Sequence, residues 1–193
     1  MPSRLRHPSA TVVDQDTRLF LFDCGEGTQH QYLHAGLRLA RTEAIFITHL
    51  HGDHFFGLPG LLSTLNLMNH QKPLPLVGPV GLKAFIEQIP SRRNDADTVL
   101  DLRFVELPED VTCEVVYESA ACRVVARPIN HSVFAVGYRF EEKDRPGNLD
   151  VDRARALGLH HFEQYRELKA GRSVTAENGR TVDPSEVVGP TQE

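Results

Sequence analysis

The sequence predicts an α/β protein in which helices and largely mixed sheets form layers. Two observations favour this class. Short apolar runs rich in β-branched and aromatic residues alternate with helix-like segments early in the chain, and four strand-like segments then follow one another. The 193 residues, of which 40% are hydrophobic, suffice for one domain with a buried core, with or without an appendage.

Local signals define the expected elements. Pro59 fits only the first turn of a helix, so that helix is predicted to begin near Leu58. Pro75 suits an edge strand or the start of a strand. In order, the expected elements are a hairpin of residues 9–14 and 18–24, a helix of residues 28–39 with Thr28 as its N-cap, a strand of residues 43–48, the helix from Leu58, a strand of residues 73–79, a helix of residues 80–89, and strands of residues 102–107, 113–119, 122–129 and 134–142.

The composition changes after about Glu142, which predicts a boundary between residues 1–142 and an appendage of residues 143–193. Residues 151–171 are charged and helix-prone with few large apolar side chains, and the Asn178-Gly179 step between β-like flanks indicates a two-residue hairpin turn. So little apolar content predicts a projecting helix-hairpin arm that lacks a core of its own.

Charge and cysteine content exclude several classes of protein. A net charge of −5 argues against a general polyanion binder, although local basic patches remain open. Three cysteines outside any C-x-x-C pair make a disulfide framework improbable. No apolar run approaches the ~18 residues of a membrane helix, and the N-terminus has no apolar signal region, so no membrane association and a cytoplasmic location are expected.

A cluster of metal-ligating side chains follows the predicted strand of residues 43–48. His49, His51, Asp53 and His54 lie in the stretch "ITHLHGDHFFG", at a spacing too close for one helix face and at a strand end, where α/β sheets place ligands. Such a loop can serve two adjacent metals, for which imidazole and carboxylate ligands favour Zn²⁺, with Mn²⁺ as the alternative. His131, just past another strand, is the best candidate for a further ligand.

Several motifs together resemble the ribonuclease Z family, the tRNA 3′-processing endonucleases of the metallo-β-lactamase superfamily. They are "FLFDCGEGTQ", "ITHLHGDHFFGLPGLL", "VGPVGLKAFIE" and "NHSVFAVGYRFEEKDRPG", followed by the arm-like tail. The H-x-H-x-D-H pattern alone indicates only the superfamily, whereas the flanking motifs are more specific. The resemblance implies an αββα metallo-β-lactamase-like sandwich, of which this chain is a part, and a zinc-dependent endonuclease that removes the 3′ trailer of precursor tRNA and leaves a 3′-hydroxyl.

The resemblance also assigns roles within the metal cluster. It implies two zinc ions per complete site, the first held by His49, His51 and His131 and the second by Asp53 and His54. It implies as well that Asp53 is the catalytic general base that positions the attacking water. Asp23 resembles a residue that supports the ligands from behind, with a strand-end turn aspartate as the alternative.

Substrate contacts implied by the resemblance fall at both ends of the chain. Arg4, Arg6 and His7 in "PSRLRH" resemble a loop near the tRNA 3′ end, with a frayed basic terminus as the alternative. The tail resembles an arm that grips precursor tRNA across a homodimer. Its candidate contacts, which a solvated helix face would also explain, are Arg153, Arg155, Arg166 and Lys169.

The family pattern extends further than the sequence given. Its bridging aspartate, last histidine ligand and candidate proton donor would lie after the arm, so the chain resembles the N-terminal half plus the arm, and little hydrolase activity is expected from it alone. Two alternative functions remain open. One is another hydrolase of the same fold, a thioesterase or lactonase, and the other is a non-catalytic tRNA-binding remnant.

Overall fold

The computed structural model describes residues 7–89, 100–144 and 147–190 of the chain. These residues divide into two compact units. The first unit comprises Met1–Glu118 and Val124–Phe140, and the second comprises Ser119–Arg123 and Glu141–Glu193. Each unit is described by itself.

The first unit contains a five-stranded sheet with the strand order β1-β2-β3-β4-β5. β1 and β2 form an antiparallel hairpin, and the pairs from β2 to β5 are parallel, so the sheet is mixed as predicted. The five strands are Thr11–Gln15, Arg18–Phe22, Thr42–Phe46, Leu74–Pro79 and Leu102–Leu107.

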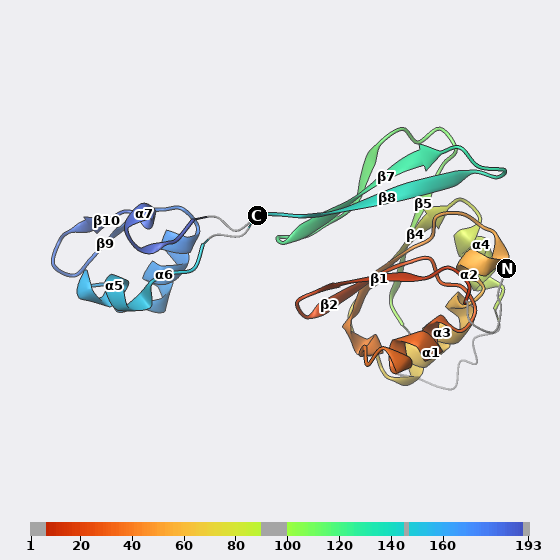
Figure 1. The fold of residues 1–193 in the computed structure, drawn as a ribbon, viewed down its shortest axis with the longest axis horizontal. Coiled ribbons are helices and arrows are strands. Elements are labelled where there is room, and N and C mark those ends of the chain that lie inside the picture. The colour runs from red at the N-terminus through yellow and green to blue at the C-terminus, as the bar shows by residue number, and fades with distance from the viewer. Residues whose placement is uncertain (1–6, 90–99, 145–146, 191–193) are drawn as a thin grey trace. The chain divides into compact units, whose positions relative to one another are not determined.

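A second sheet and a layer of helices lie on opposite faces of this sheet (Figure 1). The second sheet has the order β6-β7-β8, with strands Glu114–Glu118, Cys122–Ile129 and Ala135–Glu142. The helical segments of this unit are α1 (Thr28–His34), η1 (Leu39–Arg41, a 3₁₀ turn), α2 (Gly52–Phe55), α3 (Leu58–Leu67) and α4 (Leu82–Glu87). The layered α/β class is therefore confirmed, and α3 begins at Leu58 as expected.

Strand β2 shows how the sequence separates the two faces of the larger sheet. Because successive strand residues point to opposite faces, Leu19 and Leu21 join the aliphatic core shared with the helices. Phe20 and Phe22 point the other way, toward aromatic residues of the second sheet. The helix-facing core includes Ile45, Leu58, Leu61, Leu65 and Leu76.

Aromatic rings fill the space between the two sheets. The ring of Phe46 stacks on Phe22 at a centroid distance of 4.9 Å and lies 5.4 Å from Tyr138. Phe20 lies 5.4 Å from Tyr117 in an edge-on arrangement and 5.0 Å from Phe140. Pairs in this distance range contribute beyond the area they bury, so they hold the sheets together.

Three details of the first unit differ from the expectations. The N-cap of α1 is Gly27, not Thr28, which is the first helical residue. Strand β4 pairs with both β3 and β5, so it is not an edge strand, and Pro75 instead fits the alternative of a strand start as the second residue of β4. Pro75 is nevertheless tolerated since the recorded pairing with β3 involves only Leu76 and Val77. Helix α1 ends at His34 and does not reach residue 39, because Gly36 adopts a left-handed φ of 69° just after it.

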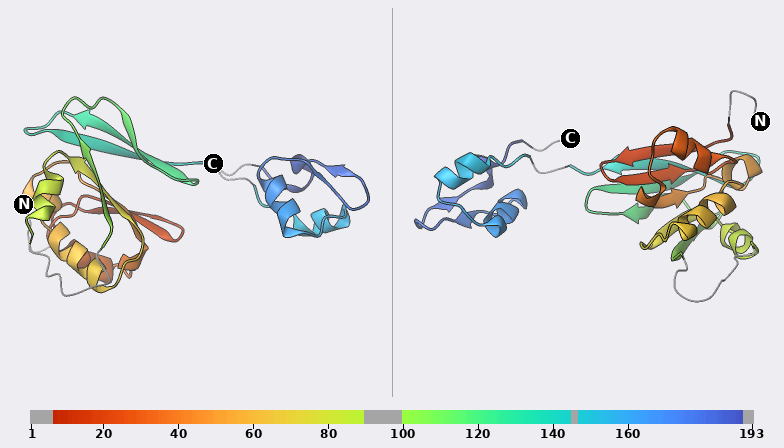
Figure 2. Two further views of the ribbon diagram at one scale, coloured as in Figure 1. Left: turned by 180° about the vertical axis from the view of Figure 1, so that it is seen from behind. Right: turned by 90° about the horizontal axis from the view of Figure 1, so that it is seen from below.

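The second unit is a small helix-hairpin assembly (Figure 2). Its elements are α5 (Val151–Ala156), α6 (Phe162–Lys169), the antiparallel pair β9 (Val174–Thr175) and β10 (Thr181–Val182), and α7 (Pro184–Val187). The single helix expected for residues 151–171 is wrong, since Gly158, at φ 85°, separates α5 from α6.

Two further expectations about the second unit are corrected. The hairpin turn is longer than two residues. The amide of Ala176 donates to the carbonyl of Arg180, and Gly179 has a left-handed φ of 79° inside that loop. The unit also has a core of its own, contrary to the expectation. Its buried members are Ala154, Leu159, Leu168, Ala176, Val182 and Val187. Small and medium side chains spaced along several elements gave no local signal of this core.

Within the described ranges, no helix has the length and apolar character that crossing a membrane requires.

Replacing the buried Leu61 of α3 by alanine is expected to lower the free energy of unfolding of the first unit by about 3 kcal/mol, because the side chain is 0% exposed and leaves a cavity. Native-state hydrogen exchange of the β3 amides measures this change. Leu67→Ala in the same helix is the matched control, since Leu67 is 86% exposed, and it should change stability by less than about 0.5 kcal/mol. Equal effects of the two substitutions would contradict the assignment of α3's buried face.

Candidate metal centre

The histidine-rich loop leaves the larger sheet at the carboxyl end of β3. The amide of Ile47 still donates to the carbonyl of Val77 on β4 at 2.8 Å, and the chain departs from the sheet after that bond. Helix α2 then starts at Gly52, a short helix that the sequence did not predict. The loop therefore lies where parallel strands end, the usual place for a ligand in an open α/β sheet.

Three imidazoles converge at this edge. His49 and His51 come from the loop, and His131 comes from the connection between β7 and β8. Their ligand nitrogens all lie within 4.8 Å of one another, close enough to hold one metal ion. Nε2 of His49 is 3.1 Å from Nδ1 of His51, and the ring of His131 lies 4.6 Å from that of His49. Three imidazoles with an open fourth position match the donor set of catalytic zinc sites.

The carboxylate of Asp23, at the end of β2, joins the parts of the cluster. Its Oδ2 lies 2.6 Å from Nδ1 of His54 and accepts a hydrogen bond from Oγ of Ser9 at 3.1 Å. Its Oδ1 accepts hydrogen bonds from the amide of Thr48 at 2.9 Å and from Oγ1 of Thr48 at 2.8 Å. Thr48 Oγ1 is in turn 2.9 Å from Nδ1 of His49, so one carboxylate orients two imidazoles.

Backbone contacts fix the same loop against the segment after β2. The amide of Cys24 donates to the carbonyl of His54 at 2.6 Å, and the amide of Gly57 donates to the carbonyl of Cys24 at 2.8 Å. The segments approach so closely that a Cβ on Gly57 would lie 2.1 Å from the carbonyl oxygen of Gly25. Glycine is required there because no side chain fits.

The second sheet holds the other side of the loop. The hydroxyl of Tyr138 donates to the carbonyl of Ile47 at 2.9 Å, and the amide of Val136 donates to the carbonyl of Thr48 at the same distance. Burial raises the pKa of Tyr138, which keeps its hydroxyl protonated as the donor. Ser9, Thr48 and Tyr138 were not predicted as site residues, and only the position of Thr48 directly before His49 hinted at such a role.

The imidazole of His49 is neutral at physiological pH. Burial is the main cause that lowers its pKa to about 4, and the neighbouring imidazoles of His54, His131 and His51 contribute, while Asp23 opposes them. A neutral ring keeps the nitrogen lone pair that a metal needs. The fold therefore prepares His49 as a ligand before any ion binds.

Asp53 and His54 occupy different positions from the three converging histidines. The side chain of Asp53 is exposed, and its backbone carbonyl accepts a hydrogen bond from the amide of Ser9 at 3.1 Å. The ring of His54 lies 4.0 Å from that of His49 but points Nδ1 at Asp23. Of the described residues, those that gather as a possible metal-binding group are His49, His51 and His131.

The predicted substrate contacts fall in separate places. Arg4 and Arg6 lie outside the described residues, and His7, the first residue that the structure describes, is exposed. Within the second unit, α5 carries two of the predicted cations and α6 the other two. All four are exposed: Arg153, Arg155, Arg166 and Lys169. Arg172 and Arg180 of the same unit form ion pairs with Glu167 and Glu186.

Comparison with known proteins agrees with this geometry. Residues 4–74 match the model of the metallo-β-lactamase superfamily. The chain is 44% identical over 191 residues to a ribonuclease Z of Salinibacter ruber and 40% identical over 194 residues to one of Lactiplantibacillus plantarum, matches that cover 98% and 99% of this chain. The similarity to ribonuclease Z therefore extends over nearly the whole of this chain. The chain spans about three-fifths of the curated relatives' length, 59% and 61% in these two cases.

Solved structures show the same fold as this chain. The short form of human tRNase Z matches with a TM-score of 0.65 and 35% identity, over 75% of this chain and 62% of the human chain. The metallo-β-lactamase fold protein YhfI of Bacillus subtilis matches with a TM-score of 0.53 at 15% identity, over 72% of this chain and 52% of that one, which supports the fold alone. The predicted metallo-β-lactamase fold is thereby confirmed.

Asp23→Asn is expected to weaken Zn²⁺ binding by the chain about 10- to 100-fold, because an NH2 group in place of Oδ2 cannot accept hydrogen bonds from Nδ1 of His54 and Oγ of Ser9. Competition with a fluorescent zinc chelator measures the affinity. The matched control is Asp16→Asn in the turn between β1 and β2, where the aspartate also has a positive φ, 56° against 59° for Asp23. An unchanged affinity in Asp23→Asn would show that Asp23 does not orient the ligands.

Proposed function

We propose that this chain carries the metal-binding part of a zinc-dependent endoribonuclease that removes the 3′ trailer from precursor tRNA and leaves a 3′-hydroxyl. The observation that supports this most directly is the convergence of His49, His51 and His131 at a strand end of a metallo-β-lactamase fold. The homology to ribonuclease Z over 98% of the chain supports the choice of RNA as substrate.

In this proposal His49, His51 and His131 hold a zinc ion. Zinc at such a site supplies Lewis-acid polarisation of a phosphoryl oxygen and lowers the pKa of water. Asp53 takes the role of general base, because its carboxylate is exposed in the first turn of α2 and its backbone is fixed by Ser9. Asp23 acts through other residues by orienting His54 and, through Thr48, His49.

A second zinc ion belongs to the same proposal. Asp53 and His54 would contribute to it, and Nδ1 of His54 is already engaged by Asp23, which leaves Nε2 as the nitrogen for a metal. Two ions side by side stabilise the attacking and leaving oxygens of a phosphodiester together. Mn²⁺ is the alternative ion for a site of mixed imidazole and carboxylate ligands.

The second unit is proposed to contact the body of the tRNA. Arg153, Arg155, Arg166 and Lys169 are exposed on its helices and are suited to phosphate contacts. The core of this unit packs α5 and α6 together and so holds the helices that carry these cations in place. A cytoplasmic homodimer, in which this unit of one copy reaches RNA held by the other, is part of the proposal.

His131→Ala is expected to reduce bound zinc from at least one ion per purified wild-type chain to well below one, because two imidazoles are too few for a tight site. Elemental analysis after dialysis measures the ratio. His34→Ala is the matched control, since His34 is exposed at the end of α1 and outside the three converging histidines. Retention of full zinc content by His131→Ala would remove His131 from the ligand set.

Cleavage of precursor tRNA tests the activity. The chain is assayed alone and also joined to the parts of the Salinibacter ruber relative that have no counterpart in it. The joined protein should release the 3′ trailer, and His49→Ala should slow it by more than about 100-fold, a larger loss than removing a residue behind the ligands produces. His34→Ala should leave the rate unchanged. A joined protein that hydrolyses a thioester or lactone but not precursor tRNA would overturn the proposal.

A further inference from the structure

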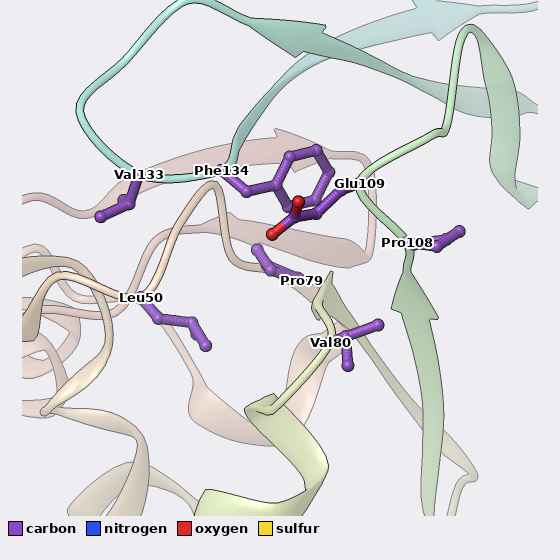
Figure 3. Close-up of a pocket in the computed structure, with 7 residues that line it drawn as sticks. All are labelled: Leu50, Pro79, Val80, Pro108, Glu109, Val133 and Phe134. Atoms are coloured by element: carbon purple, nitrogen blue, oxygen red, sulfur yellow. The ribbon is translucent and has the colours of Figure 1, made fainter.

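An apolar pocket lies in the first unit beside the segments that carry the three converging histidines. It has a volume of about 430 Å³ and is lined by Leu50, Pro79, Val80, Pro108, Glu109, Val133 and Phe134 (Figure 3). That volume falls in the usual range for small-ligand sites. No role in metal binding uses any of these seven residues.

The pocket lies close to the metal centre, because two of its lining residues are near the ligands in sequence. Leu50 stands between His49 and His51 in the same loop, and Val133 follows His131 by two residues, a span of at most about 7 Å. Pro79 ends β4 and Pro108 follows the end of β5, so the pocket opens at the carboxyl ends of the parallel strands, as the metal loop does. A group bound here therefore lies close to the loops that carry the three histidines.

The lining residues suit a ligand that is flat and apolar and that has a hydrogen-bond donor at its edge. Six of the seven residues are apolar, and the half-buried Phe134 offers an aromatic ring. Val80 and Val133 are 61% and 41% exposed, so the pocket shows apolar surface to an incoming ligand. The seventh residue, Glu109, places a carboxylate among these side chains (Figure 3), where it accepts hydrogen bonds and repels anions.

This combination fits a nucleobase better than the other groups such an enzyme meets. A phosphate is excluded because the lining contains a carboxylate and no lysine, arginine or histidine. An acyl chain would fill the apolar part of the pocket but has no hydrogen-bond donor for the carboxylate of Glu109. A base stacks on an aromatic ring through its face and presents its exocyclic amine at the edge. Uracil lacks that amine and places carbonyl oxygens beside its ring N–H.

We propose that this pocket binds the base of a nucleotide that flanks the scissile phosphate, with Phe134 stacking on the base and Glu109 favouring bases that carry an exocyclic amine. The inference rests on the proposed function, because it needs a phosphodiester substrate at the histidines. It adds a specificity element that the metal ligands do not provide.

Binding of a short RNA tests the inference with the zinc-loaded chain. The RNA is an acceptor-stem minihelix with a 3′ trailer and a phosphorothioate at the cleavage position, and anisotropy of a terminal dye reports the affinity. An abasic residue at one of the two flanking positions should weaken binding about tenfold. Phe134→Leu should weaken binding of the unmodified RNA by a similar factor. The two changes together should cost little more than either alone, because they remove the same contact.

Base preference tests Glu109. With adenine, cytosine, guanine or uracil at the same position, the wild-type chain should bind uracil most weakly, and Glu109→Gln should narrow that difference. Asp110→Asn is the matched control, because Asp110 is an acidic neighbour as exposed in class as Glu109 but does not line the pocket. Zinc content equal to wild type shows that each variant retains the fold.

The outcomes separate this inference from the proposed function. Equal affinity for the abasic and unmodified RNA at both positions, with RNA binding otherwise intact, would overturn the pocket assignment alone. Additive losses for Phe134→Leu and the abasic residue would also overturn it, because the two groups would then not touch. No binding of the minihelix or of full precursor tRNA would overturn the proposed function and this inference with it.

Discussion

The carboxylate of Asp23 is the interaction on which the metal centre depends. It lies at the end of β2, yet it bonds to Ser9, to Thr48 and to His54, which belong to three other segments. Its backbone has a left-handed φ of 59°, a conformation that aspartate tolerates better than most residues. The carboxylate orients His54 directly and His49 through Thr48, so the larger sheet fixes the orientation of both imidazole rings. A rigid scaffold of this kind reduces the entropy lost when an ion binds.

The cluster also shows how a fold prepares ligand chemistry before the ligand arrives. His49 is 6% exposed and surrounded by other imidazoles, so protonation is unfavourable there, and with Nδ1 bonded to Thr48 the lone pair of Nε2 remains available. Tyr138 and Val136 fasten the loop from the second sheet. The loop is therefore held by both sheets of the first unit, and relaxing it would require breaking contacts in each.

Local sequence patterns predicted what depends on local order and missed what depends on contacts between distant segments. The strands, the start of α3 at Leu58 and the histidine cluster follow from spacing and proline placement. The interior position of β4 and the core of the second unit depend on which elements meet, which no short window reports. The hydrogen bond from the hydroxyl of Tyr138 to the carbonyl of Ile47 joins residues 91 positions apart, and neither local sequence indicates it.

The alternation in β2 constrains the length of that strand more than its composition. Its leucines face the helices and its phenylalanines face the second sheet, so each layer receives its side chains from every second residue. Exchanging one leucine for another aliphatic residue disturbs one layer only. Inserting or deleting a single residue would turn the leucines toward the second sheet and the phenylalanines toward the helices. It would also turn the side chain of Asp23 away from Thr48 and His54. During divergence, this segment should therefore accept substitutions but not changes in length.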